Sequence, residues 1–216
     1  FTLYSRDGAH DLAIDRQHTY YSQDGCAAHT LDFETGQRRQ STRADIARMA
    51  LISDYLDTID VISPTVSATD VPPVGTPVYE LEACFLNSGK HVLTESVTSA
   101  REARGQIELA AAIAGGEEAL RARPIFSNFI CTISPLTQDE GGMEAALEFA
   151  AAGVPVGTYP MATTGVTSPI TLAGTLAMVN AENISALAMI QIASPGAKVF
   201  YSGGPATIDL RTGAYT

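Results

Sequence analysis

The chain has no G-x-G-x-x-G loop after any of its apolar runs. That absence removes the main reason to expect a dinucleotide-binding sheet. Basic residues are scarce as well, because 13 Lys and Arg stand against 24 Asp and Glu, for a net charge of −11. Phosphate binding needs a basic face, so this balance argues against a nucleic-acid partner.

Cysteine is also rare, and its spacing excludes the common cysteine frameworks. The three cysteines, Cys26, Cys84 and Cys131, form no C-x-x-C pair. An odd number at wide spacing predicts free thiols in a reducing compartment, here the cytoplasm. Cys26 and His29 have ligand-like spacing but lack a second pair, so we expect no metal site.

Charge is nearly missing from the second half of the chain. Between Pro124 and Thr216 only eight residues are charged. A small domain must solvate its outer surface, so this region is expected to be covered by further chain or by another subunit, and we expect a homo-oligomer. The alternative is a surface rich in Ser and Thr.

The most apolar stretch, Thr171 to Ile192, has the length of a membrane span. Asn180, Glu182, Asn183 and Gln191 interrupt it, which favours a buried helix and no membrane contact. Ser168 is expected to cap this helix, with Pro169 in its first turn.

Five apolar runs each break into a polar loop, and each of the first four is followed by a helical segment before the next run begins. This order predicts parallel strands with helical crossovers, and its spacing fits a β/α barrel better than a doubly wound sheet. We therefore predict an α/β fold: an incomplete (β/α)8 TIM barrel of about five units over residues 60–216, as part of a larger enzyme. The strands are centred on Val61, Val92, Phe126, Val156 and Phe200.

The first 59 residues have a different pattern. Short alternating runs at Leu12–Ile14, Thr19–Tyr21 and His29–Phe33 are separated by glycine-containing turns. Thr42 then begins an amphipathic helix. The pattern predicts a small N-terminal β-meander and a linking helix, over residues 1–59, packed on the barrel end.

Seven segments together resemble the trimethylamine methyltransferase family, and the resemblance runs over essentially the whole chain. They are Asp60-Val61-Ile62, Gly115 to Pro124, Ser134-Pro135-Leu136, Thr171 to Gly174, Asn180-Ala181-Glu182, Tyr201-Ser202-Gly203 and Asp209 to Gly213. Family members are TIM barrels of roughly twice this length, so the chain looks like part of one.

The resemblance implies methyl transfer from a methylated amine, such as glycine betaine or trimethylamine, to the cobalt of a corrinoid carried by a partner protein. It implies no corrinoid bound tightly by this chain. Some relatives use pyrrolysine at a position beyond Thr216, so the sequence leaves the branch of the family open.

A methylammonium group is best held by aromatic faces with a carboxylate nearby, and barrel enzymes place such groups where strands end. Polar and aromatic residues near the predicted strand ends are therefore candidate substrate-binding residues, with no catalytic residue assigned. They are Glu95, Asn128, Thr132, Ser134, Tyr159, Met161 and Tyr201.

Structural roles compete with these assignments. Glu95 could cap the helix that starts near Ala100, Asn128 and Thr132 could bond neighbouring strands, and the tyrosines could fill the barrel. Asp139 and Glu140 suit the start of a helix, where negative charge is favourable.

Two other classes of function stay open. One is a different barrel enzyme, a pterin-linked methyltransferase or a lyase. The other is a non-catalytic piece that only binds or assembles. A Schiff-base lyase would need a lysine on a strand, and the only lysines, Lys90 and Lys198, precede strands.

Overall fold

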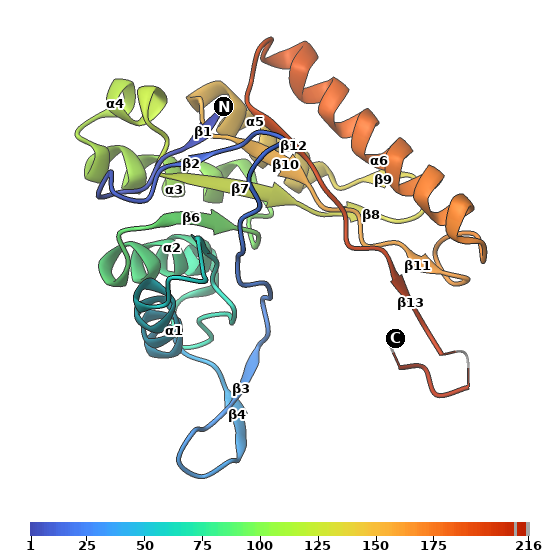
Figure 1. Cartoon of the computed structure of the whole chain (residues 1–216), viewed down its shortest axis with the longest axis horizontal. Coiled ribbons are helices and arrows are strands. Elements are labelled where there is room, and N and C mark those ends of the chain that lie inside the picture. Colours follow the sequence, from blue (N-terminus) through green and yellow to red (C-terminus); the bar gives the residue numbers. More distant parts are fainter. Residues whose placement is uncertain (210, 215–216) are drawn as a thin grey trace.

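The centre of the fold is a five-stranded parallel sheet (Figure 1). The computed structural model describes residues 1–209 and 211–214. The sheet order is β12–β10–β7–β6–β5, and every neighbouring pair is parallel, so the strands follow one another in chain order. The prediction of five consecutive parallel strands is confirmed, and their order is consistent with part of a TIM-like barrel. The bounds are β5 Val61–Ile62, β6 His91–Thr94, β7 Phe126–Ile130, β10 Val156–Thr158 and β12 Val199–Tyr201.

Helices cover one face of this sheet and enclose the main apolar core. Phe126 of β7 lies at its centre, with its ring edge-on to Phe85 at 6.5 Å and to Phe149 at 5.8 Å between centroids. We call the opposite side of the sheet the open face. The helices are α1 Arg43–Tyr55, the 3-10 turn η1 Pro73–Gly75, α2 Thr76–Asn87, α3 Ala100–Ala114, α4 Glu117–Ala122, α5 Glu140–Ala152 and α6 Leu172–Ala193.

The first turns of the helices confirm two expectations and correct one. Thr42 begins α1 in a reciprocal capping box with Asp45, and Asp139 caps α5 by accepting the Gly142 N–H at 2.6 Å. For α6 the expected cap was wrong. Thr171 caps the helix and Pro169 precedes it, while the Ser168 hydroxyl bonds the Thr175 hydroxyl at 2.9 Å.

The N-terminal region is two separate hairpins, and the structure does not confirm a continuous β-meander. β1 (Thr2–Leu3) pairs with β2 (Leu12–Ala13), and β3 (His29–Leu31) pairs with β4 (Arg38–Gln40). The segment between them follows the edge of the main sheet, where Ser22 forms a parallel bridge with Val61. Two small pairs lie further along: β8 Thr132–Ile133 with β9 Thr137–Gln138, and β11 Thr163–Thr164 with β13 Ala206–Thr207.

The first hairpin covers part of the open face. Leu3 and Leu12 pack on Val61 in a small second core, with Leu93 and Phe200 against it. Gly157 provides the space for neighbouring rings, because a Cβ there would lie 2.3 Å from the ring of Phe129. Along each strand, successive side chains thus point in turn toward the helices and toward the open face.

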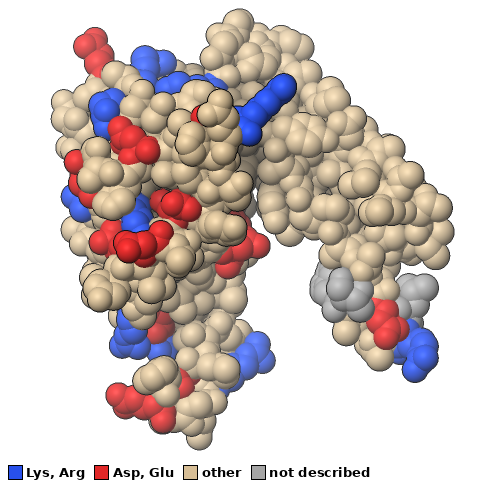
Figure 2. Space-filling model, viewed as in Figure 1, with Lys and Arg blue, Asp and Glu red and all other residues tan. Residues whose placement is uncertain are grey.

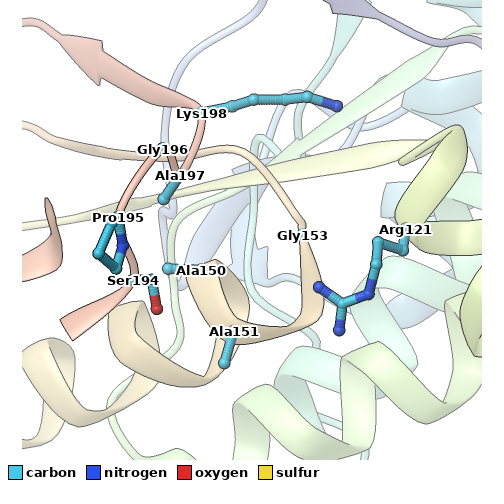
Figure 3. A pocket seen from close by; sticks show the side chains of 9 residues that line it. All are labelled: Arg121, Ala150, Ala151, Gly153, Ser194, Pro195, Gly196, Ala197 and Lys198. Carbon is cyan, nitrogen blue, oxygen red and sulfur yellow. The ribbon is translucent and has the colours of Figure 1, made fainter.

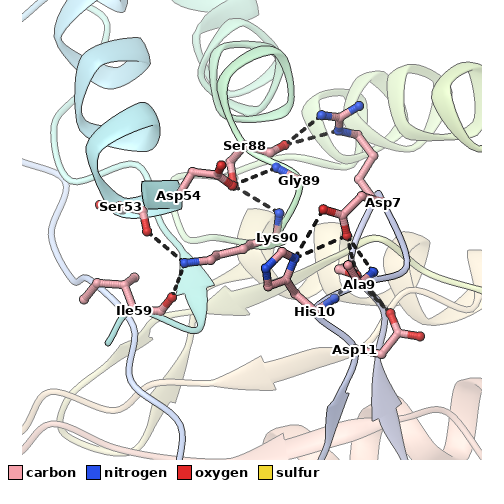
Figure 4. A network of polar contacts seen from close by, with 12 residues as sticks. Asp7, Ala9, His10, Asp11, Ser53, Asp54, Ile59, Ser88, Gly89 and Lys90 are labelled. Atoms are coloured by element: carbon pink, nitrogen blue, oxygen red, sulfur yellow. Dashed lines mark hydrogen bonds and ion pairs between the residues drawn. The ribbon is translucent and has the colours of Figure 1, made fainter. Parts of the chain in front are cut away.

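A buried lysine joins α1 to the start of β6 (Figure 4). Lys90 is 3% exposed, and its ammonium donates to the carbonyls of Ser53 at 2.9 Å, Leu56 at 2.9 Å and Ile59 at 2.7 Å. α1 has no basic residue in its last turn, so Lys90 supplies the cation that the end of the helix favours. The carboxylate of Asp54 also accepts the Gly89 N–H at 2.9 Å.

We predict that Lys90→Met destabilises the protein by about 3 kcal/mol, because buried carbonyls lose a charged donor. Urea unfolding followed by circular dichroism measures this. The matched control is Lys198→Met, which changes the partly exposed lysine before β12 and should cost less than about 1 kcal/mol. Equal effects of the two variants would contradict the structural role of Lys90.

Candidate functional site

Four strands place one polar side chain each on the open face, just past their last residues. These residues lie on the same side of their strands as the residues of the small second core, so they point away from the helices. The Ser63 hydroxyl donates to the Glu95 carboxylate at 3.4 Å. In β/α folds this edge, where parallel strands end, is where reactive groups gather. The four residues are Ser63, Glu95, Cys131 and Tyr159.

A second carboxyl arrives from the N-terminal segment. Ala27 forms a parallel bridge with Val66, so residues 22–27 run beside the end of β5. Gly25 makes this approach feasible, because its φ is +128° and a Cβ would lie 3.1 Å from the Thr65 carbonyl oxygen. The segment brings the Asp24 side chain to Glu95, where the two carboxyl groups interact through a hydrogen bond. Sequence reasoning used Asp24-Gly25 only as a turn and missed this contact.

The pKa of Glu95 is raised to about 7, first by burial and then by the charge and hydrogen bond of Asp24. The bond from Ser63 opposes this shift in part. Among the described residues, no Lys, Arg or His forms an ion pair with Glu95. Burial and the Glu95 charge also raise the pKa of the Cys131 thiol, to about 11. The open face therefore carries excess negative potential in a poorly hydrated place.

The Tyr159 ring lies within electrostatic range of this carboxyl pair, and the Phe129 ring lies next to Tyr159. The ring centroids of Phe129 and Tyr159 are 5.9 Å apart. Burial raises the pKa of the Tyr159 hydroxyl, and the charges of Asp24 and Glu95 raise it further, so it stays a neutral phenol. Gly204 lets the backbone approach this ring, because a Cβ there would lie 2.6 Å from the Tyr159 hydroxyl.

A hollow of about 380 Å³ opens beside Glu95, and its volume suits a small molecule. It is lined by Glu95, Val97, Thr98, Cys131, Thr132, Ile133, Asp139, Gly141 and Gly142. Another hollow, of about 340 Å³, lies where β10 and β12 begin and includes Arg121 and Lys198 (Figure 3). We favour the first as the functional site, because chemistry in β/α folds gathers where strands end.

The structure places the predicted site residues on both sides of the sheet. Glu95 and Tyr159 lie on the open face, and Ser99, not Glu95, caps α3. Asn128 lies on the helix side, where its amide donates to the carbonyl and hydroxyl oxygens of Thr94 at 2.9 and 3.0 Å. The Tyr201 hydroxyl donates to Asn180 of α6 at 2.7 Å, so it also points toward the helices.

The remaining predicted residues lie after β7 and β10. Thr132 and Ser134 donate to the buried carboxylate of Glu182 at 2.7 and 2.9 Å, and the Leu136 N–H donates to it at 2.8 Å. Glu182 thereby fastens the β8–β9 turn to α6, although Thr132 also lines the hollow. Met161 is 53% exposed beyond β10.

Comparisons of the sequence with known proteins all lead to one group of relatives. A profile of the family described as trimethylamine methyltransferase (MTTB) matches residues 1–216. The trimethylamine methyltransferase MttB of Desulfitobacterium hafniense is 34% identical over 209 residues, covering 97% of this chain and 42% of its own length. The trimethylamine methyltransferase MttB of Methanosarcina barkeri is 36% identical over 179 residues, covering 80% of this chain and 35% of its own length. A glycine betaine methyltransferase of D. hafniense is 25% identical over 214 residues, covering 99% of this chain and 44% of its own length.

The parallel α/β sheet and these relatives point to one protein family. The chain belongs to the trimethylamine methyltransferase family. It spans less than half the length of these relatives.

We predict that Glu95→Gln raises the melting temperature at pH 8 and leaves it unchanged at pH 4. The folded-state pKa of Glu95 lies above its unfolded value, so its contribution to stability is present below pH 4.5 and is lost as the pH rises to about 7. Gln cannot ionise and avoids that loss.

Differential scanning fluorimetry between pH 4 and 8 measures the difference between variant and parent. The buried His91, whose pKa is lowered to about 4 by burial, acts in the opposite direction but is common to both proteins and cancels. Glu144→Gln, on the exposed side of α5, is the control. A Glu95→Gln difference that does not grow with pH would refute the electrostatic description of the site.

Proposed function

We propose that the whole protein, in the cytoplasm, removes a methyl group from a small methylated amine, most simply a quaternary one, and transfers it to the cobalt of a corrinoid on a partner protein. The observation that carries this proposal is the Glu95 carboxyl, which lies near Asp24 and within electrostatic range of Tyr159, without a cationic partner among the described residues. The names of the relatives, which mention trimethylamine and glycine betaine, support the substrate class.

A quaternary ammonium group has no N–H to donate, so charge and aromatic faces must recognise it. Glu95 and Asp24 supply the charge, and Tyr159 and Phe129 supply the rings. A bound cation would favour the ionised form of Glu95 and lower its raised pKa. Loss of one methyl from a quaternary nitrogen leaves a neutral amine, so this transfer needs no proton from Glu95. The role of the carboxyl pair is therefore to bind and orient the amine.

A corrinoid ring is far larger than the hollow beside Glu95, which has room for a small amine and not for an enclosed corrinoid; of the four residues assigned to the amine, Glu95 alone lines this hollow. This supports a corrinoid carried by a partner that meets the edge where the strands end. When bound there, the reduced corrinoid supplies the nucleophile and accepts the methyl group. The residues of this chain hold the amine in line and exclude water from it.

The positions of the two lysines argue against the alternative function, a lyase that forms a Schiff base. Lys90 is buried and donates to three carbonyls, so it is not free to form a Schiff base. Lys198 lies at the opposite end of the strands from the carboxyl pair. The second rival, a piece that only binds, concerns this chain alone, which we expect to be inactive without the rest of the barrel.

The test uses the full-length protein with a reduced corrinoid protein and a panel of glycine betaine, carnitine, proline betaine and trimethylamine. We expect loss of the cobalt(I) absorbance with at least one of them. Glu95→Gln should lower kcat/KM by about 100-fold, because the cationic head loses its charged partner. Glu144→Gln should keep parental activity. No conversion of any methylated amine, under conditions where a known relative works, would refute the proposed function.

A further inference from the structure

The second carboxyl of the candidate site comes from a segment outside the main sheet. Residues 21–27, which we call the strap, run along the outer edge of β5 and bring Asp24 to Glu95. The two ends of the strap accept backbone hydrogen bonds from β5 and from the loop after it, at 3.2 Å to the Tyr21 carbonyl and 2.9 Å to the Ala27 carbonyl. Asp24 lies between these two attachments.

The β10–β12 side of the sheet brings no charge to this site. Between residues 154 and 205 only Glu182 and Lys198 are charged. Glu182 accepts the bonds of the β8–β9 turn, and Lys198 lies before β12, at the opposite end of the strands. In the space-filling view the α6 side of the molecule carries almost no charged atoms (Figure 2). The charge beside Glu95 therefore depends on how firmly the strap is held.

Gln23 fastens the strap one residue before Asp24. Its amide oxygen accepts the Ser63 N–H at 3.3 Å, and its amide nitrogen donates to the Ser53 hydroxyl of α1. Because a backbone N–H can only donate, the atom that faces Ser63 must be the amide oxygen. In a regular parallel ladder the Ser63 N–H would bond to a backbone carbonyl of the neighbouring strand. The Gln23 side chain takes that place where the strap leaves the edge of β5.

Gln23 and Asp24 point to opposite sides of the strap, because neighbouring side chains of an extended segment alternate. Gln23 is half-buried against α1 and β5, whereas Asp24 is exposed and reaches Glu95. Ser63, whose N–H bonds to Gln23, also donates its hydroxyl to Glu95 at 3.4 Å. One amide side chain therefore holds two groups that hydrogen-bond to Glu95.

We propose that Gln23 is a positioning residue for the methylated amine: it holds Asp24 and Ser63 against Glu95, so that the two carboxyl groups meet the cationic head as a pair. This inference rests on the proposed function, because that function assigns the carboxyl pair to the amine. Gln23 acts through Asp24 and Ser63. Holding both carboxyl groups in place before the amine arrives lowers the ordering cost of binding.

The first test needs no activity. Gln23→Met keeps the length of the side chain and removes both of its hydrogen bonds. The melting-temperature gain from Glu95→Gln at pH 8 is measured in the parent and again in the Gln23→Met protein. With the strap released, Asp24 raises the pKa of Glu95 less, so the gain should be smaller in the second background. A general loss of stability cancels, because each gain is a difference within one background.

The other groups near Glu95 do not disturb this comparison. The thiols and the phenol in its electrostatic range have raised pKa values and stay neutral up to pH 8, and Asp139 is unchanged in every variant; the three neutral groups are Cys26, Cys131 and Tyr159. The control background, Gln17→Met, changes an exposed loop residue and should leave the gain at its parental value. An equal gain in the Gln23→Met and Gln17→Met backgrounds would overturn the proposal.

Kinetics of the full-length protein at pH 8, with reduced corrinoid protein and the best amine of the panel, test the role in binding. Gln23→Met should lower kcat/KM by about tenfold, mainly through KM, and Asp24→Asn should act in the same direction. In the Asp24→Asn background, Gln23→Met should cost at most about a further twofold, because both changes act on one carboxyl pair. Fully additive losses would contradict a role through Asp24. If no methylated amine is converted, the proposed function fails, and the melting comparison alone decides whether Gln23 positions the pair.

Discussion

The alternation of side chains along the parallel strands is the constraint on which both faces of this protein depend. Because β6, β7 and β10 pair in register, Thr94 lies opposite Asn128 and Ile130 lies opposite Thr158, all on the helix side. The next residue of each strand faces the other way, which places Glu95 and Tyr159 together. A slip of one residue would exchange the apolar core with the candidate site.

This constraint also explains which parts of the fold the sequence could predict. Strand order follows from chain order when each crossover is a helix, so the five parallel strands were predictable. The face of a residue at a strand end depends on the last paired residue, which composition does not define. Tyr201 does end β12, whereas Asn128 lies in the middle of β7, and both side chains point toward the helices.

The candidate site was predictable only where its residues belong to the strands. Glu95 and Tyr159 follow strand ends directly, and sequence reasoning found both. Asp24 lies far away in the chain and reaches Glu95 because the Ser22 and Ala27 bridges guide the N-terminal segment along β5. An isolated bridge leaves no periodic pattern in the sequence from which it could be predicted. Thr132 and Ser134 were chosen as polar residues after a strand, whereas their partner Glu182 lies on a helix some fifty residues later.

Under the proposed function, the carboxyl pair would also link stability to ligand binding. Above pH 7 the folded protein holds an ionised Glu95 near Asp24 in a partly buried place, so folding carries an electrostatic cost that the unfolded chain avoids. A cation bound between them removes that cost in the folded state alone. It must therefore bind more tightly as the pH rises, and it must stabilise the fold by the same coupling.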